Sequence, residues 1–578
     1  MIPKKTDVLI VGAGPIGLMT AIMLQRLGVE TVLIERRAGL HDAPQAHVIS
    51  ARSMEICRSI GISDARLRAK ASNPMDTIFI RWVDHLLGQD LGVYSMISDP
   101  ATMKRMLSQT PTPVCNLSQD QFERVLFDQM PAAAQPLFEH SWQSYRPHQD
   151  GYISQIERGD GTEFEISSRF IIAADGAGSR VRSAIGAQME GPDQIQSYVT
   201  IHFHADLRKD LDDRVGLLYW IMDPECAGCF IAHNIDQNWV YMNALREDLP
   251  ANGIDESLFE ARLRRAIGSD VAIDIKSFST WRMTAQVSSA YQKDGVFLVG
   301  DAAHRFPPTG GLGMNTGIQD AHNLTWKIAM VLKGASPALL DTYETERRPS
   351  AVSNSRQSHE NFLKMSEVET SLDTDGDGVI SAADFTSLKN DPERQVQVQA
   401  AIQRQAKHFN MRGLDLGVSY TSALIVPDGV PPIVDDPICQ YEPSTVPGTR
   451  LPHAWLKRGD RQISVLDLVR ADRFLVLASK PLADAVLSAL DGLKDLGRGV
   501  DLVIVLEGHE IAPADDQFDE IFAEDHILIV RPDGHIAARL PADMPTSLLQ
   551  DTFDKILPIL GGKPDDSSRG TRRDETVC

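Results

Sequence analysis

The sequence predicts an α/β protein with a Rossmann-like nucleotide-binding domain, an antiparallel β-sheet inserted into it, and a smaller α/β domain at the C-terminal end. Three observations predict this arrangement. A strand, a glycine-rich turn, a helix and a second strand ending in an acid open the chain. Short alternating apolar runs, typical of antiparallel strands, fill about residues 187–285. After about residue 416, apolar strands alternate with helical stretches.

The length and charge of the chain bound its class. Its 578 residues are enough for about two to four domains. The 57 basic and 79 acidic residues give a net charge of −22, which argues against nucleic acid and against anionic membranes as partners. Six scattered cysteines form no disulfide framework and favour a reducing compartment, the cytoplasm. No apolar run reaches membrane-spanning length.

The N-terminal stretch carries a dinucleotide-binding fingerprint. Residues 7–11 read as a buried strand, 12–17 as a glycine turn, 18–27 as a helix and 31–34 as a second strand. We expect the turn amides to hold a pyrophosphate and the acid after the second strand to bind a ribose 2′-hydroxyl. A glycine-rich turn of an unrelated α/β fold is the alternative. The residues concerned are Gly12, Gly14, Pro15, Gly17, Glu35 and Arg36.

Two further strands run into an acid and a glycine. Residues 171–174 lead into Asp175-Gly176. Residues 296–299 lead into Gly300-Asp301, a proline–glycine loop and a helix that begins near Met314. Such a helix start offers N–H groups and a positive dipole end to an anionic ligand. An ordinary strand–helix turn is the alternative for this loop.

In this order, the three motifs resemble those of class A flavoprotein aromatic hydroxylases of the phenol hydroxylase type. Residues 326–329 and 343–349 extend the resemblance, and residues 447–453 resemble the matching part of chlorophenol and hydroxybiphenyl monooxygenases. The resemblance covers nearly the whole chain. It implies an FAD-binding domain over residues 1–186 (with a candidate excursion into the substrate domain near 75–100) and 286–365, a substrate-binding β-sheet domain over 187–285, a helical linker over 366–415, a thioredoxin-like domain over 416–560 and a disordered tail over 561–578.

The same resemblance implies an enzyme that binds FAD, takes a hydride from NAD(P)H and activates O2 as a flavin C4a-hydroperoxide. This species would hydroxylate a phenolic ring at the carbon ortho to its hydroxyl. Residues 307–311 would form the flavin face where oxygen reacts, with Pro307 as a stiff wall. The helix start would face the flavin pyrimidine edge, which turns anionic on reduction. The expected cofactor-binding set also includes Gln45, Arg52, Gln119, Asp175, Gly300, Asp301, Pro308, Gly311, Gly313, Met314 and Asn315.

The substrate side of the site needs a base, because phenolate is a better nucleophile than phenol. Relatives that act on substituted phenols carry a histidine in the context that His47 occupies here, and a neutral imidazole suits the role. A histidine that only packs between a loop and a helix is the alternative. Tyr219, Trp220 and Trp281 are candidates to line the pocket, although aromatic core residues would look the same.

Residue 45 departs from the family pattern, and a segment of the C-terminal domain bears on thiol chemistry. Gln45 stands where relatives have an arginine near the FAD diphosphate, which leaves the nicotinamide affinity and the choice between NADH and NADPH open. Residues 478–481 lack the cysteines of a redox-active thioredoxin motif, which argues against thiol chemistry in the C-terminal domain.

An acidic loop at residues 373–384 matches a calcium-binding loop, with a glycine at its sixth position and an aspartate at its twelfth. A solvated acidic turn that caps helices is the alternative. The candidate ligands of Ca²⁺ are Asp373, Asp375, Asp377, Val379, Ser381 and Asp384.

The expected partners are a small phenolic substrate and O2, and a homodimer is expected because most relatives with the third domain dimerise. The same scaffold also serves polyketide and antibiotic hydroxylases, which differ in the size of the pocket. A calcium-binding interaction protein with a vestigial flavin site is an alternative from another class. The intact glycine motifs oppose it.

Overall fold

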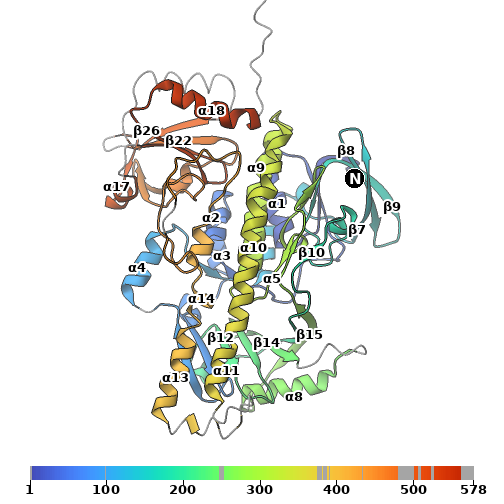
Figure 1. The fold of residues 1–578 in the computed structure, drawn as a ribbon. Coiled ribbons are helices and arrows are strands. Elements are labelled where there is room, and N and C mark those ends of the chain that lie inside the picture. The colour runs from blue at the N-terminus through green and yellow to red at the C-terminus, as the bar shows by residue number, and fades with distance from the viewer. Residues whose placement is uncertain are drawn as a thin grey trace, which may run out of the picture.

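The structure is a computed structural model that describes residues 3–97, 99–245, 253–373, 381, 384, 387–388, 391–431, 434–479, 500–505, 509–522 and 526–560. It has three parts (Figure 1). The N-terminal nucleotide-binding domain and the C-terminal domain lie side by side at one end, and a second large sheet forms the other end. The long helix α10 (Asp341–Lys364) runs lengthwise between them.

The nucleotide-binding domain is built on a sheet with the order β17-β18-β9-β1-β2. Its parallel strands place the ends of β1, β9 and β18 next to one another, because Val11 pairs with Ala173 and Ala173 with Leu298. The three acid and glycine motifs of the sequence follow these strands directly. The strands are β1 (Lys5–Val11), β2 (Thr31–Ile34), β9 (Glu163–Ala173), β17 (Gln292–Lys293) and β18 (Val296–Leu298), and the antiparallel hairpin β7 (His140–His148) and β8 (Gly151–Arg158) joins β9.

Helices α1 (Pro15–Arg26) and α9 (Leu312–Leu332) pack beside this strand edge. Glycine makes the close approach possible. A Cβ atom at Gly317 would lie 2.9 Å from the Gly300 Cα, and one at Gly17 would lie 1.9 Å from the Gly12 carbonyl oxygen. The other elements here are β3 (Val48–Ile49), α2 (Ala51–Ser59), α3 (Asp64–Arg68), α4 (Pro100–Ser108), β6 (Cys115–Asn116), α5 (Gln119–Phe127), α6 (Arg180–Ala184), β10 (Met189–Glu190), β16 (Gln286–Ser288), β19 (His304–Arg305) and the short 3-10 helices η1 (Pro74–Thr77), η2 (Ala132–Ala134), η3 (Gly300–Ala302) and η4 (Pro337–Leu339).

The second sheet has the order β15-β11-β14-β13-β12-β4-β5. One face packs on α8 (Glu256–Ile267) through a cluster that includes Phe203, Phe230 and Trp239. On the other face, the half near β4 and β5 is covered by α11 (Ser366–Leu372) and α13 (Pro392–Gln403). The strands are β4 (Phe79–Val83), β5 (Asp90–Ser95), β11 (Gln196–His204), β12 (Leu218–Ile221), β13 (Gly228–Asn234), β14 (Asn238–Leu245) and β15 (Asp274–Met283), with the short helix α7 (Arg208–Leu211) beside them.

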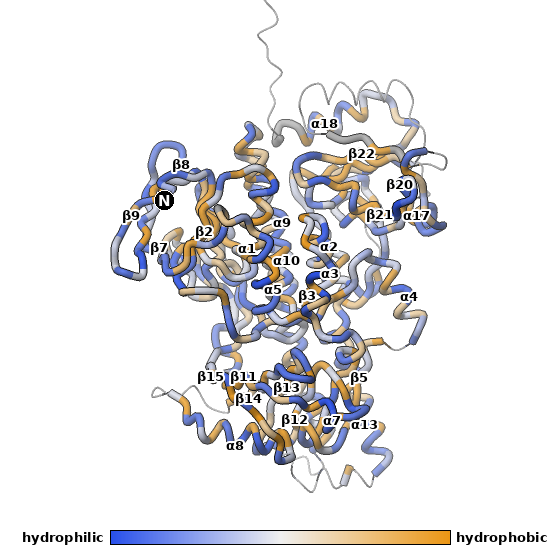
Figure 2. Tube along the Cα trace, turned by 180° about the vertical axis from the view of Figure 1, so that it is seen from behind, coloured by the Kyte–Doolittle hydropathy of each residue, from blue (hydrophilic) through white to orange (hydrophobic). Residues whose placement is uncertain are grey.

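The C-terminal domain is a four-stranded sheet of order β23-β22-β25-β26, in which the first pair is parallel and the others antiparallel. Figure 2 shows that β22 is apolar, whereas the outer end of β8 in the nucleotide-binding domain is hydrophilic. The sequence also predicts a helix at 481–493. This helix and the predicted tail at 561–578 lie outside the described residues. The short helices α14 (Ala406–Phe409) and α15 (Arg412–Leu416) precede the domain. Its elements are β20 (Trp455–Arg458), β21 (Arg461–Ser464) and β24 (Ile511–Pro513), which form a second, three-stranded sheet, and η5 (Val465–Leu468), β22 (Phe474–Ala478), β23 (Val500–Ile504), α17 (Asp516–Phe522), β25 (His526–Val530), β26 (Ile536–Pro541) and α18 (Thr546–Leu560).

These observations confirm the predicted fold class. Across the part of the chain that the structure describes, no helix has both the length and the apolar character needed to cross a bilayer.

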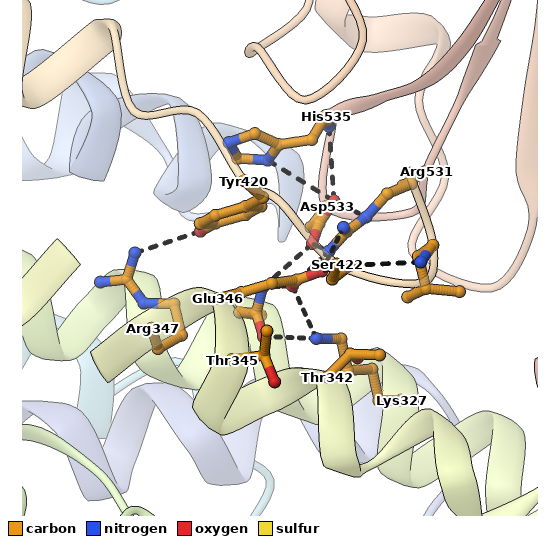
Figure 3. Close-up of polar contacts among 12 residues, drawn as sticks. Lys327, Thr342, Thr345, Glu346, Arg347, Tyr420, Ser422, Arg531, Asp533 and His535 are labelled. Carbon is orange, nitrogen blue, oxygen red and sulfur yellow. Dashed lines mark hydrogen bonds and ion pairs between the residues drawn. The ribbon is translucent and has the colours of Figure 1, made fainter. Parts of the chain in front are cut away.

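A buried network of charges joins α9 and α10 to the C-terminal domain (Figure 3). Glu346 on α10 accepts hydrogen bonds from Lys327 Nζ at 2.8 Å and from Arg531 Nη1 at 2.6 Å. Arg531 also binds Asp533, and the Ser422 hydroxyl donates to Glu346 at 2.6 Å. Because these charged groups are at most 2% exposed, each depends on the others for compensation of its lost hydration.

A second branch of the network reaches the third glycine motif. Arg347 donates to Asp320 Oδ1 at 2.8 Å and to the Tyr420 hydroxyl at 3.1 Å. The other oxygen of Asp320 lies 2.9 Å from His304 Nε2 and accepts from the Gly300 amide at 3.3 Å. The end of β18 is therefore held by charges that also contact the C-terminal domain.

We expect Glu346→Gln to lower the free energy of unfolding by about 3–5 kcal/mol, because it leaves buried cations without their carboxylate. Glu360 is a matched control on the same helix, where it pairs with Arg356 at 2.9 Å on the exposed surface. Glu360→Gln should cost less than about 1 kcal/mol. Equilibrium urea unfolding followed by circular dichroism measures both, and equal losses would contradict a stabilising role for the network.

Candidate functional site

The first glycine turn combines a tight backbone with open space. Gly12 has φ +99°, and a Cβ atom there would lie 2.3 Å from the Ala174 carbonyl oxygen. At Gly14, by contrast, an added Cβ would have no atom of the described chain within 4 Å. Pro15 opens α1, and among the described residues no side chain caps this helix start. The Gly12 amide donates to the Ile34 carbonyl and the Ala13 amide to Glu35, so the amides at the start of α1 are the ones suited to a pyrophosphate.

Glu35 ends β2 and is buried. Its carboxylate accepts from the Ala13 amide at 2.8 Å and from the Arg37 amide at 2.9 Å. Burial by itself raises the pKa of Glu35, but the hydrogen bonds from Arg37 and Ala13 bring it below its ordinary value. The Arg37 guanidinium also donates to both oxygens, at 3.0 and 3.3 Å, so a ribose hydroxyl would take the place of an Arg37 contact on the ionised carboxylate. The neighbouring predicted residues, Arg36 and Gln45, are exposed.

The second motif contains a carboxylate oxygen without a partner. Asp175 Oδ2 accepts from the Arg180 amide at 2.9 Å, whereas the buried Oδ1 has no hydrogen-bond partner within the described structure. Burial raises the pKa of Asp175. Arg182 links this motif to the third one, because its guanidinium donates to the carbonyl oxygens of Ala177 and Ala302 at 2.8 and 2.9 Å.

The third motif contributes the acid Asp301 and the start of α9, which has no side-chain cap in the described chain. Asp301 is exposed to solvent, yet desolvation raises its pKa, and both are true of a group that lines an internal opening. Gly311 is the N-cap of α9 with φ +64°, and the described chain places no side-chain cap there. A Cβ at Gly313 would meet no described atom within 4 Å. The 21-residue helix therefore directs its positive end at open space.

The proline loop lies beside this helix start. Pro307 is buried and Pro308 is exposed. The Thr309 hydroxyl donates to the Ser358 carbonyl oxygen of α10 at 2.6 Å, which anchors the loop. The rigid loop, the unpartnered Asp175 oxygen, the accessible Asp301 and the free helix start together fit FAD, whose ADP half would lie at the first turn and whose flavin ring would lie at α9.

Some predicted cofactor residues have side chains that are engaged within the protein. The Asn315 side chain accepts from the Ser50 amide at 2.9 Å and donates to the Val48 carbonyl at 2.9 Å. Arg52 is buried and donates to the Asp533 carbonyl in the C-terminal domain at 2.7 Å. The Gln119 amide group donates to Glu123 at 2.9 Å, and Met314 is buried in the core. Asn315 thereby fixes β3, and with it the preceding residue, His47, next to the start of α9.

His47 belongs to a chain of hydrogen bonds that spans two domains. Its Nδ1 lies 2.6 Å from Asn116 Oδ1, Asn116 Nδ2 donates to Ser72 Oγ at 2.8 Å, and the Ser72 hydroxyl donates to the His233 carbonyl at 2.6 Å. Because the serine hydrogen goes to the carbonyl, the serine oxygen accepts from the Asn116 amide group. The Asn116 oxygen then faces His47 and accepts its Nδ1–H, which leaves the lone pair on Nε2. Burial lowers the pKa of His47, so the ring is neutral at pH 7.

The three aromatic candidates divide between the two faces of the sheet. Trp281 stacks on Tyr198 with 4.6 Å between ring centroids, on the face opposite α8. Trp220 lies on the same face but at the end covered by α11 and α13. Tyr219 packs in the α8 cluster, and its hydroxyl donates to the Arg214 carbonyl. Because neighbouring strand residues point to opposite faces, Tyr219 cannot line the same surface as Trp220.

Most of the predicted calcium loop lies outside the described residues, including Asp375, Asp377 and Val379. The described Ser381 amide and hydroxyl both donate to Asp384 at 2.7 Å, which is a helix-capping contact. Elsewhere in the described chain, His85, Asp223 and Cys226 bring metal-binding atoms together, but the Arg265 guanidinium already lies 3.0 Å from the Asp223 carboxylate.

Sequence reasoning missed three residues of the site: Ser72, Asn116 and His233. Asn116 ends the short strand β6, which lies outside the three glycine motifs. Ser72 and His233 carry no motif, and only the folding of distant strands brings them to His47.

Comparison with known proteins agrees with this geometry. The family described as FAD binding domain matches residues 5–358, and the family described as aromatic-ring hydroxylase, C-terminal, matches residues 444–558. A 2,4-dichlorophenol 6-monooxygenase from Delftia acidovorans is 30% identical over 93% of this chain and 95% of its own length. A tetracenomycin B2 monooxygenase-dioxygenase from Streptomyces olivaceus is 29% identical over 96% of this chain and 99% of its own. The crystal structure of the flavin-dependent monooxygenase PieE in complex with FAD and substrate is 30% identical, with a TM-score of 0.88 over 97% of this chain and 100% of that one.

We expect Gly14→Val to weaken FAD binding at least about tenfold, or roughly 1.4 kcal/mol, with little change in the melting temperature of the apoprotein. The added side chain meets open space in the protein but would occupy the place of the pyrophosphate. Gly12→Val is the contrasting variant, because its Cβ collides with the backbone and should lower both properties. Titration of apoprotein with FAD and a melting curve separate the two effects. Unchanged FAD affinity in Gly14→Val would contradict this placement of the cofactor.

Proposed function

This chain belongs to the flavoprotein aromatic-ring hydroxylases, monooxygenases that bind FAD, and we propose that it uses NAD(P)H and O2 to hydroxylate a phenol at the carbon ortho to its hydroxyl. The observation that carries this proposal is His47, a neutral histidine with a free Nε2 lone pair that is tied to the start of α9 through Asn315. The chlorophenol monooxygenase relative supports a monocyclic phenol as substrate.

FAD, when bound, supplies the redox chemistry that transfers electrons from NAD(P)H to O2. The residues of this chain hold it and shape its surroundings. The Gly12–Gly17 turn and Glu35 would hold the ADP half, while Asp175 and Asp301 have acceptor oxygens for its central part. The start of α9 would favour the reduced flavin, because a positive helix end stabilises negative charge at the pyrimidine edge.

His47 would take the phenol proton at Nε2. Its Nδ1–H is committed to Asn116, so the lone pair that remains can accept a hydrogen bond from the substrate hydroxyl. Proton transfer makes the ring carbons more electron-rich at the ortho and para positions. The buried Pro307 beside the flavin site offers no N–H group and helps to exclude water.

We also propose how the protein docks reduced nicotinamide, that it is a cytoplasmic homodimer, and that it binds calcium. The reduced nicotinamide would dock transiently at the flavin, near the exposed Gln45. The cytoplasmic homodimer predicted from the sequence is tested by fractionation and by sedimentation. Calcium binding at residues 373–384 is tested by a calcium titration of the whole protein.

A polyketide hydroxylase is the second candidate function, and the similarity to the tetracenomycin monooxygenase-dioxygenase over nearly the full chain favours it. Pocket size separates the two. Substrate-stimulated NAD(P)H oxidation, measured with product analysis on simple phenols and on fused-ring hydroxyquinones, would decide between them. A purified protein that takes up no FAD would contradict both and favour a calcium-binding interaction protein.

We expect His47→Ala to lower kcat for phenol hydroxylation by about 10²–10⁴-fold, because it removes the group proposed to accept the phenol proton. His41→Ala is the matched control, since His41 lies in the same loop and its side chain has no place in the proposed chemistry. FAD content should be normal in both variants. A normal hydroxylation rate of His47→Ala at every pH would exclude His47 as the base.

We expect Asn116→Asp to move the acid limb of the pH–rate profile to higher pH. Burial keeps the pKa of His47 below its ordinary value, so the active neutral ring persists as the pH falls below 6.5. A carboxylate at residue 116 would stabilise the imidazolium and raise this pKa. The profile of kcat/KM against pH for the wild type and Asn116→Asp tests the shift. Superimposable profiles would show that Asn116 does not set the protonation of His47.

A further inference from the structure

His233 is a buried histidine whose ring nitrogens have no hydrogen-bond partner among the described residues. Its side chain belongs to a residue that is 5% exposed, and neither ring nitrogen has a hydrogen-bond partner in the described structure. Other histidines of the region do have partners: His47 contacts Asn116, and His202 Nε2 lies 2.8 Å from Asn238 Oδ1. Because buried polar groups in folded proteins are nearly always hydrogen-bonded, the His233 ring is suited to a ligand.

The backbone aims this ring at the site. The register between β13 and β14 shifts between Ala232 and Asn234, so His233 is the extra residue of a β-bulge. Bulges redirect side chains and occur often beside active sites. His233 follows Ala232, which packs in the α8 cluster, and points to the opposite face of the sheet.

On that face His233 meets His47. The two rings lie edge to face, with 5.4 Å between centroids, and they come from different domains. The Ser72 hydroxyl holds the His233 carbonyl, and the same hydroxyl orients Asn116. One hydrogen-bond chain therefore fixes the relative position of both histidines.

The surroundings of His233 make it a neutral hydrogen-bonding group. Burial lowers its pKa well below the ordinary value, and the neighbouring His47 and His202 lower it further. A neutral imidazole has one N–H donor and one acceptor nitrogen. Ile231 and Val240, which pair with each other on the same face, are buried apolar residues suited to contact a ring. This face of the sheet thus offers apolar contacts from Ile231 and Val240 and one hydrogen-bonding group, His233.

We propose that His233 is a substrate-binding residue and that, together with His47, it selects phenols that carry a second oxygen on the neighbouring ring carbon. His47 would take the hydroxyl that directs the reaction, and His233 would bind the adjacent oxygen. With 5.4 Å between the ring centroids, each histidine can bind its own oxygen when the substrate carries two oxygens on neighbouring ring carbons. The inference rests on the proposed function and narrows its substrate class.

The test compares phenol with catechol (benzene-1,2-diol) as probes. Their dissociation constants are measured from the change in flavin absorbance on titration of the FAD-loaded protein, without turnover. The wild type should bind catechol more tightly than phenol. His233→Phe keeps a ring but removes both nitrogens, and it should weaken catechol binding at least about tenfold, the loss expected when one buried hydrogen bond is removed. Its effect on phenol should be smaller than about threefold.

Two further variants separate recognition from folding. His233→Gln retains a donor and an acceptor and should restore part of the preference for catechol. His204→Phe is the matched control, because His204 is a histidine of the same sheet next to His202 rather than His47, and it should leave both constants unchanged. The assignment of His233 is overturned if His233→Phe changes both constants equally, or if the wild type hydroxylates phenol but does not prefer catechol. A wild type that binds FAD but no phenol overturns the proposed function as well.

Discussion

The buried carboxylate of Glu346 is the constraint on which the arrangement of the domains depends. It lies without solvent contact between Lys327 of α9 and Arg531 of the C-terminal domain, and removing either partner would leave an uncompensated charge in the interior. Helices α9 and α10 and the C-terminal domain must therefore adopt one relative position. In the C-terminal domain, Ala478 and Ser479 stand where a redox-active thioredoxin has the cysteine that follows its strand. The contribution that the structure shows for this domain is therefore to complete the charge network.

The position of α9 then determines the site. Arg347 binds Asp320, and Asp320 accepts a hydrogen bond from the Gly300 amide. These contacts connect the charge network to the end of β18 and to α9. Asn315, in the first turn of α9, donates to the Val48 carbonyl in β3 and accepts from the Ser50 amide just after β3. The same helix places His47 beside its start and would direct its positive end toward a bound flavin. A displacement of α9 would disturb both the electrostatics of the cofactor site and the position of the base.

The two halves of the site have different tasks. In the proposed function, the nucleotide-binding domain contributes His47 and Asn116, which would act on the hydroxyl common to all phenols. The large sheet contributes His233 and its apolar neighbours Ile231 and Val240, which would contact the part of the substrate that differs between phenols. Ser72 joins the halves through the His233 carbonyl. In this arrangement, exchange of residues on the sheet can change the substrate while the chemistry at the flavin stays the same.

The sequence by itself determined the features that depend on local chain geometry. Gly12, Gly14, Glu35 and the Gly300–Met314 segment were predictable, because a strand, a tight turn and a helix start are specified by neighbouring residues. Tertiary structure decided what depends on direction and on distant contacts. Only the fold shows that Arg52 turns toward Asp533 and that Tyr219 faces α8, because strand and helix patterns do not say which neighbour each face meets. His233 reaches His47 through a bulge whose position is set by the pairing of two strands, and pairing register is a property of the assembled sheet.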